Sequence, residues 1–185
     1  MSAPTKLPAH SPSCMGCGPE NASGLQLEVY RDGDRVFADH SFTTKHSGGP
    51  GLAHGGAISA ACDDIMGFTL WIAGTPAVTR TLTVKYRRPV PLHVPVRLTA
   101  CIDEDADHIL HIGASGTVDG ETYFSATGEF VKVDLMHFAR YADTSTVDSF
   151  SSIFFARTDL LRCPALPADS PVRGETASGS IRPTV

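Results

Sequence analysis

The residues with the clearest chemical potential lie in one stretch, residues 51–67, where a glycine-rich loop leads into an apolar run. His54 is followed there by Gly55 and Gly56. If a helix begins at this point, its first N–H groups lack intrahelical partners and carry partial positive charge. The glycines let a substrate oxygen approach those groups, which would polarise a carbonyl. Asp63 lies seven residues after Gly56 and so on the same helix face, where its carboxylate could act as a nucleophile or as a base.

The apolar run predicts a helix that starts at His54 or Gly55, continues to about Ala73 and is ended by Gly74 and Pro76. Apolar residues cover most of its circumference, so the helix belongs in a core. A carboxylate there is costly unless it is paired or used.

Asp63 and Asp64 are neighbours and point about 100° apart on a helix. One of them could therefore be solvated or salt-bridged while the other serves a site. A purely structural reading also stays open, in which the turn at residues 54–56 is only a tight turn before the helix.

Thr79, Thr81 and Thr83 alternate along the segment after the helix, which predicts that they share one face of a strand. They are candidates to assist at the site, although strands also favour threonine for its shape. Arg87 and Arg88 end the same segment. This pair suits a phosphate-bearing ligand, and a solvated strand end is the alternative.

Period-two alternation and turn residues predict the elements that must position these side chains. Asp-Gly pairs at 32–33 and 119–120 predict hairpin turns. The order of two strands, one helix and four strands indicates an α+β protein, with an antiparallel sheet packed on a single helix. The predicted strands are residues 25–30, 35–42, 77–88, 94–102, 108–118 and 121–133.

The two ends of the chain are expected to lie outside this domain. Residues 1–13 carry three prolines and are predicted to be an irregular, mobile lead-in to a domain over residues 14–135. Residues 136–185 would form a C-terminal extension. It is expected to contain a short amphipathic helix over 149–161 and a disordered tail over 163–185, rich in Pro, Ser, Gly and Thr.

Composition narrows the partners and the location. The formal net charge of −5 disfavours nucleic-acid binding, which usually needs a basic patch. No apolar run approaches the roughly 20 residues that span a bilayer. The N-terminus lacks the apolar stretch of a signal peptide, so a cytoplasmic location without membrane contact is expected.

The five cysteines are odd in number, which argues against a disulfide framework. Cys14 and Cys17 have the spacing of half a zinc site. No second Cys-x-x-Cys pair exists, and His40 and His46 could complete the site only if the fold brings them close. No metal and no cofactor are therefore expected, and the pair is interpreted as a turn with two reduced thiols.

Several motifs together resemble a known family. They are Cys14-x-x-Cys17-Gly-x-x-Asn21-x-x-Gly24-Leu25, then Pro50-Gly51-x-x-His54-Gly55-Gly56-Ala57-Ile58, then Asp63, then Thr79 to Pro89 ending in Tyr-Arg-Arg-Pro. With these motifs in this order, residues 14–135 resemble the hotdog-fold acyl-CoA thioesterases. The resemblance is to the PaaI-like branch of the 4-hydroxybenzoyl-CoA thioesterase superfamily.

The resemblance implies a curved antiparallel sheet wrapped around one central helix, in a homodimer or a dimer of dimers with the active site at the dimer interface. It implies hydrolysis of an acyl-CoA thioester to a free acid and CoA without a metal. In that reading Asp63 is the nucleophile or general base, and residues 54–56 orient and polarise the thioester carbonyl. Thr79 or Thr81 helps to place the attacking water, and the spacing to Asp63 favours Thr79.

One departure from the family concerns the loop before the helix. Some relatives carry an asparagine six positions before the histidine, where this chain has Gly48, so His54 would have to carry more of the work. The alternative function is a non-catalytic acyl-CoA-binding or lipid-binding hotdog protein. A hotdog hydratase is disfavoured because the loop lacks an Asp-His dyad. The sequence does not indicate the acyl chain.

Overall fold

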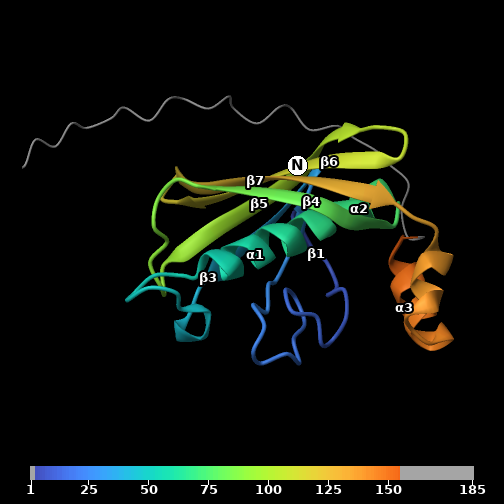
Figure 1. Cartoon of the computed structure of the whole chain (residues 1–185), viewed down its shortest axis with the longest axis horizontal. Coiled ribbons are helices and arrows are strands. Elements are labelled where there is room, and N and C mark those ends of the chain that lie inside the picture. Colours follow the sequence, from blue (N-terminus) through green and yellow to red (C-terminus); the bar gives the residue numbers. More distant parts are fainter. Residues whose placement is uncertain (1–2, 155–185) are drawn as a thin grey trace, which may run out of the picture.

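The computed structural model describes residues 3–154 of the 185-residue chain. Seven strands and several helices follow one another along this part of the chain (Figure 1). In chain order they are β1 (Thr5–Lys6), β2 (Tyr30–Asp32), β3 (Arg35–Ser41), the 3₁₀ turn η1 (Thr44–His46), α1 (Gly55–Gly67), α2 (Thr69–Ala73), β4 (Ala77–Tyr86), β5 (Pro95–Asp105), β6 (Ile109–Val118), β7 (Glu121–Lys132), η2 (Leu135–Arg140) and α3 (Thr144–Phe154).

The strands form one antiparallel sheet in the order β1-β2-β3-β5-β6-β7-β4. Helix α1 lies along one face of this sheet, and the N-terminal loop lies on the other side of the helix (Figure 1). The predicted α+β architecture, an antiparallel sheet packed on a central helix, is confirmed. β4 ends the sheet, so one of its edges has no neighbouring strand among the described residues.

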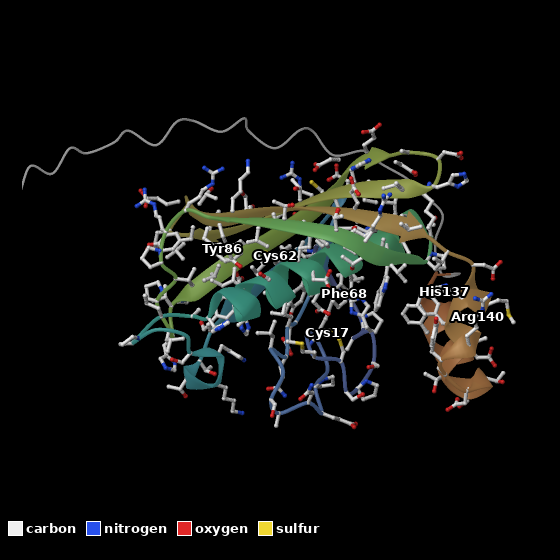
Figure 2. All side chains as sticks on the ribbon, viewed as in Figure 1. Cys17, Cys62, Phe68, Tyr86, His137 and Arg140 are labelled. Atoms are coloured by element: carbon white, nitrogen blue, oxygen red, sulfur yellow. The ribbon has the colours of Figure 1, made fainter. Side chains whose placement is uncertain are left out.

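The core lies between α1 and the sheet. Figure 2 shows Cys62 between them, whereas Phe68 and Cys17 lie on the side of the helix that the N-terminal loop covers. The buried side chains of α1 belong to one apolar cluster with those of the strands. Burying each large apolar side chain contributes about 1.5–3 kcal/mol, which keeps this helix beneath the sheet. The buried residues of α1 are Ile58, Ala61, Cys62, Ile65 and Met66.

The predicted helix exists, but it is interrupted. α1 ends at Gly67, Phe68 serves as the cap between the two segments, and α2 continues to Ala73. The Thr69 hydroxyl donates a 2.7 Å hydrogen bond to the Met66 carbonyl at this break. Gly74 closes the run with a φ of 63°, a left-handed conformation that glycine adopts readily, as the sequence predicts.

The first predicted strand is only partly a strand. Leu25 and Leu27 are buried, as the alternation predicts, but the ladder begins at Tyr30. The Leu25 and Leu27 amides donate instead to the carbonyls of Met15 and Gly16. The backbone of the cysteine loop therefore takes the place of a neighbouring strand, which local alternation cannot indicate.

The predicted C-terminal helix starts earlier than the sequence suggests. α3 (Thr144–Phe154) begins five residues before the predicted start at residue 149, because the Asp143 carboxylate accepts from the Thr146 N–H at 2.8 Å and caps its first turn. Residues 155–185, with the predicted tail and Cys163, lie outside the described residues. In the part of the chain that the structure describes, no helix is long and apolar enough to cross a membrane. The cytoplasmic location stays a prediction.

Candidate active site

His54 occupies the N-cap of α1. Its backbone is extended, and its Nδ1 atom accepts a 2.8 Å hydrogen bond from the Gly56 N–H. In the neutral ring the proton therefore sits on Nε2. The Gly56 N–H is thus engaged by the histidine, whereas the sequence leaves both glycine amides open to a substrate. The cap fixes the histidine ring at the positive end of the helix.

The loop before the helix packs its backbone directly against the histidine. A Cβ atom at Gly48 would lie 2.8 Å from the His54 Cα and 3.2 Å from its Cβ. The His54 N–H also donates to the His46 carbonyl at 2.8 Å, which holds the two segments together. A side chain at position 48 would require one of them to shift, so no asparagine can stand here without rearranging the loop.

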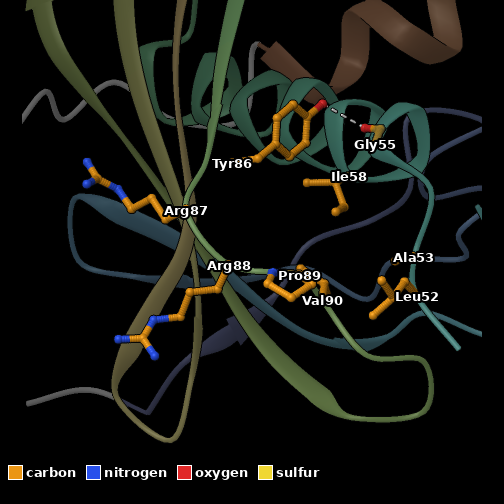
Figure 3. A pocket seen from close by; sticks show the side chains of 9 residues that line it. All are labelled: Leu52, Ala53, Gly55, Ile58, Tyr86, Arg87, Arg88, Pro89 and Val90. Carbon is orange, nitrogen blue, oxygen red and sulfur yellow. Dashed lines mark hydrogen bonds between the residues drawn. The ribbon is translucent and has the colours of Figure 1, made fainter. Parts of the chain in front are cut away.

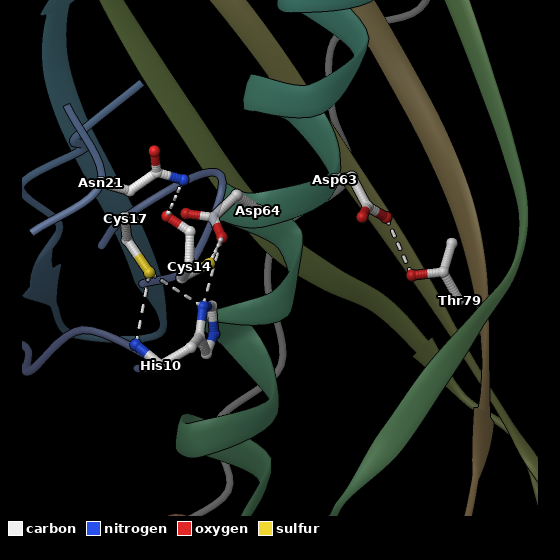
Figure 4. A network of polar contacts seen from close by, with 7 residues as sticks. All are labelled: His10, Cys14, Cys17, Asn21, Asp63, Asp64 and Thr79. Carbon is white, nitrogen blue, oxygen red and sulfur yellow. Dashed lines mark hydrogen bonds and ion pairs between the residues drawn. The ribbon is translucent and has the colours of Figure 1, made fainter. Parts of the chain in front are cut away.

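Asp63 and Thr79 meet across the gap between α1 and β4. The Thr79 hydroxyl donates a 2.8 Å hydrogen bond to Asp63 Oδ1 (Figure 4). Asp63 is half-buried and Thr79 is exposed on the edge strand. This contact turns one carboxylate oxygen toward the open edge of the sheet and leaves the threonine oxygen able to accept a further hydrogen bond.

The expectation that Thr79 and Thr81 face the same way is wrong. Thr79 pairs with Phe130 and Thr81 with Glu129, so β4 contains one extra residue at Arg80. Such a bulge reverses the alternation of side chains beyond it. After the bulge, Leu82 packs against the core, so its neighbour Thr81 points to the opposite face of the sheet, away from α1.

Asp64 lies on the opposite side of α1 from Asp63 (Figure 4). Its Oδ1 atom is 3.2 Å from His10 Nδ1 and accepts from the Cys14 thiol at 3.4 Å. Asp64 is thus tied to the N-terminal loop, and Asp63 is the carboxylate that faces β4. The sequence distinguishes the two only by spacing.

A cavity of about 330 Å³ opens at the start of α1 (Figure 3). The Tyr86 hydroxyl donates to the Gly55 carbonyl at 2.9 Å and lies 2.7 Å from the Ser59 hydroxyl. Arg88 contributes to the wall and also pairs with Glu121 at 3.0 Å on the surface. The residues that line the cavity are Leu52, Ala53, Gly55, Ile58, Tyr86, Arg87, Arg88, Pro89 and Val90.

The cavity and the carboxylate lie along one stripe of the helix. Gly55, Ser59 and Asp63 are four residues apart and so follow one side of α1. Tyr86 contacts the first two, and Thr79 contacts the third. Sequence reasoning missed Ser59 and Tyr86 as site residues. The four-residue spacing from Gly55 to Asp63 would have pointed to Ser59. Its partner Tyr86 could not be found in this way, because the face to which Tyr86 points depends on the bulge in β4.

The nearest thiol is not a competing nucleophile. Burial, with a smaller contribution from the Asp63 charge, raises the pKa of Cys62 to about 12. The side chain is fully buried in the core beside the site. Because the thiolate is the reactive form, Cys62 stays inert at neutral pH.

His40 and His46 do not complete the half zinc site. Their rings are 5.8 Å apart and pack with Phe42. The group near the cysteines consists instead of His10 and Asp64. His10 lies in the segment predicted to be an irregular lead-in, so no spacing rule in the sequence indicates it.

Comparison with known proteins agrees with this fold. Residues 50–117, which include α1 and β4, match the sequence model of the thioesterase superfamily. The antiparallel sheet around a central helix has the hotdog architecture, and residues 50–117 are similar to the thioesterase superfamily.

Among curated relatives, the chain is 30% identical over 121 residues to the acyl-coenzyme A thioesterase THEM4 of Bos taurus. That match covers 63% of this chain and 50% of the relative. The acyl-coenzyme A thioesterase THEM5 of Homo sapiens is 28% identical over 90 residues, covering 48% of this chain and 36% of the relative. The chain therefore spans half or less of the length of these relatives.

Solved structures share the architecture. A thioesterase superfamily protein is 29% identical with a TM-score of 0.61, and the match covers 64% of this chain and 60% of that one. The phenylacetic acid degradation protein PaaI of Thermus thermophilus, in a mutant form, is 21% identical with a TM-score of 0.55, covering 59% and 95%. A hypothetical thioesterase of Streptococcus pneumoniae, solved with coenzyme A, is 18% identical with a TM-score of 0.55, covering 58% and 88%. The last two support the fold alone.

Proposed function

We propose that this protein is an acyl-CoA thioesterase that hydrolyses a thioester to a free acid and CoA. The observation that carries the proposal is the Asp63 carboxylate, held by Thr79 on the same side of α1 as the cavity at the helix start. The names of the curated relatives support the same activity. In the reaction the water oxygen bonds to the acyl carbon, the C–S bond breaks, and CoA leaves as the thiol.

The carbonyl would be polarised at the start of α1. There the helix dipole places partial positive charge, and the Gly55 N–H is the first donor of the helix. Negative charge that develops on the carbonyl oxygen would be stabilised at this point. The bond from Gly56 to His54 Nδ1 keeps the imidazole in one orientation beside the same oxygen. The Gly55 N–H and the His54 imidazole are thus proposed to bind and polarise the thioester, and Gly56 is proposed to orient His54.

Asp63 would activate the water or attack the thioester itself. Its carboxylate accepts from Thr79, and the Thr79 oxygen can accept a hydrogen bond from a water in turn. This arrangement would aim the water at the bound carbonyl. Thr79 is the proposed positioning residue, and Thr81 has no role at the reacting atoms because it points to the other face of the sheet.

The phosphate end of CoA is proposed to contact Arg87 and Arg88. Both line the cavity, whose other walls are mostly apolar. A guanidinium can bind a phosphate with two parallel hydrogen bonds. The Arg88 contact with Glu121 is an exposed pair, which contributes about 0–1 kcal/mol, so exchange for a phosphate costs little.

The active unit is proposed to be a homodimer or a dimer of dimers. β4 ends the sheet and carries Thr79, so its outer edge exposes backbone groups beside the site. Pairing of two such edges would join two sheets and place each site next to the partner. The dimer would also cover an edge that is otherwise prone to aggregation.

The proposal is tested by turnover on a panel of acyl-CoA esters, from short aliphatic to aromatic and long-chain, with released CoA measured by a thiol reagent. The expected result is multiple turnover on at least one class of ester. Saturable acyl-CoA binding by calorimetry without CoA release would instead favour a non-catalytic binding protein. The panel also identifies the acyl chain, which the cavity lining does not specify.

A further inference from the structure

Four side chains meet between the N-terminal loop and the helix face opposite Asp63. They are His10, Cys14, Cys17 and Asp64 (Figure 4). Each offers one metal-ligating atom, and the four atoms lie within 4.8 Å of one another. His10 Nδ1 is 3.1 Å from Cys17 Sγ and 3.2 Å from Asp64 Oδ1. Cys14 Sγ is 3.4 Å from the same Asp64 oxygen.

These distances suit a tetrahedral ion. Zinc ligands lie about 2.0–2.3 Å from the metal, so ligand atoms in a tetrahedron are roughly 3.3–3.8 Å apart. The three separations given above differ from that spacing by a few tenths of an ångström. Two sulfurs, one imidazole nitrogen and one carboxylate oxygen form a closed set of four protein ligands. Such a set is typical of structural rather than catalytic zinc.

The loop backbone is shaped to hold thiolates. The His10 N–H donates to Cys17 Sγ at 3.3 Å. The backbone N–H groups of Gly16 and Cys17 also face the Cys14 sulfur. Donors aimed at both sulfurs stabilise the charged form that binds a metal.

The contact between loop and helix leaves room only for glycine. A Cβ atom at Gly16 would lie 2.1 Å from the Asp64 Cγ atom. The loop backbone between the two cysteines therefore rests on the carboxylate itself. The other carboxylate oxygen, Asp64 Oδ2, is buried and has no hydrogen-bond partner among the described residues. A buried carboxylate oxygen that lacks a partner is costly, and a bound cation beside it would offset that cost.

We propose that His10, Cys14, Cys17 and Asp64 bind one structural Zn²⁺ ion that fastens the N-terminal loop to α1. The proposal does not rest on the thioesterase function. Asp63 and Thr79 lie on the other side of the helix, so the ion would not touch the carboxylate proposed to act on the thioester. The sequence shows only the two cysteines of the set as a motif, because His10 and Asp64 join them through the fold.

The test is metal content and cobalt spectroscopy on the full chain, produced in zinc-supplemented medium and kept under a thiol reductant. About one zinc per chain by elemental analysis is expected. After exchange, Co²⁺ should give the visible absorption of a tetrahedral site and a sulfur-to-cobalt charge-transfer band. Chelation should lower the melting temperature by roughly 5–10 °C, and added zinc should restore it.

Variants separate the cluster from other thiols. Cys14→Ser and Cys17→Ser should each lose the cobalt charge-transfer intensity, and Asp64→Asn should weaken zinc retention about tenfold or more. Cys101→Ala removes a buried thiol outside the cluster and should keep one zinc per chain. Wild-type protein that is folded by circular dichroism yet holds no zinc and gives no cobalt spectrum would overturn the proposal, whatever the variants do. Equal metal loss in Cys101→Ala would overturn it as well.

Discussion

At the scale of single residues, the proposed site depends on which of two adjacent carboxylates faces β4. Asp63 and Asp64 have the same chemistry and differ by one position on α1. Their neighbours separate them, since Asp63 accepts from Thr79 and Asp64 contacts His10 and Cys14. The rotation of about 100° per helical residue thus directs one carboxylate toward the sheet edge and the other toward the loop.

The two threonines of β4 provide a matched pair for a first prediction. Thr79→Ala removes the hydroxyl that donates to Asp63 and should lower kcat by roughly 10–100-fold, with KM changed little. Thr81→Ala makes the same chemical change on the opposite face of the sheet and should leave kcat within about twofold. Steady-state kinetics on the best ester of the panel measures both. A larger loss in Thr81→Ala than in Thr79→Ala would refute the geometry of the bulge.

A second prediction concerns His40 and acid stability. Burial, with a smaller effect of nearby His46, lowers the pKa of His40 to about 4. In the unfolded chain the same histidine has its ordinary pKa of about 6.5. Between these values the unfolded state binds more protons, so the free energy of unfolding falls as the pH drops from 6.5 to 4. The loss is about 1–3 kcal/mol.

Denaturant unfolding across this pH range measures the effect. His40→Gln removes the titrating ring and should flatten the dependence between pH 6.5 and 4. His108→Gln alters a histidine that is largely exposed and should keep the wild-type slope. If the free energy of unfolding of His40→Gln falls with pH as steeply as that of the wild type, another group causes the loss of stability in acid.

At the scale of elements, the sequence predicts which segments form strands better than it predicts how the strands pair. Alternation predicts strands 35–42, 77–88, 94–102, 108–118 and 121–133, and each corresponds to a strand from β3 to β7. The Asp119-Gly120 turn has two positive φ angles, as its residue types favour. These features follow from local preferences, which a single chain displays directly.

The bulge at Arg80 and the cysteine loop could not be predicted in the same way. A bulge adds one residue relative to the partner strand. The sequence of β4 alone does not show how its residues pair with those of β7, so it does not predict the bulge. His10 and Asp64 are 54 positions apart, so their contact follows from the tertiary fold. For this reason the sequence points to Asp63 and residues 54–56 as candidates, but not to Ser59, Tyr86 or the direction of Thr81.

A third prediction addresses the contact between Tyr86 and α1. Tyr86 lines the cavity, and its hydroxyl bonds to the Gly55 carbonyl and to Ser59. Tyr86→Phe removes these contacts and keeps the ring, so KM for acyl-CoA should rise about three- to tenfold with little change in melting temperature. Tyr123→Phe, a matched change outside the cavity wall, is the control. Unchanged KM in Tyr86→Phe would remove the tyrosine from the substrate site.

At the scale of the whole molecule, the exposed edge of β4 leads to a prediction of assembly. Thr79 lies on this edge, so an edge-to-edge dimer would complete the surroundings of each site. Sedimentation equilibrium at micromolar concentration should give twice or four times the mass of the chain. Specific activity should fall on dilution below the dissociation constant. A species with the mass of one chain and constant activity per chain would contradict the dimer.

The central claim is that Asp63 drives the hydrolysis, and its most direct test is single-residue replacement with matched kinetics. Asp63→Asn keeps the size and the contact with Thr79 but removes the carboxylate charge. It should lower kcat by about 10²-fold or more while acyl-CoA still binds. Circular dichroism and the melting temperature should confirm that the variant is folded. If folded Asp63→Asn hydrolyses the best ester at the wild-type rate, Asp63 does not drive the reaction.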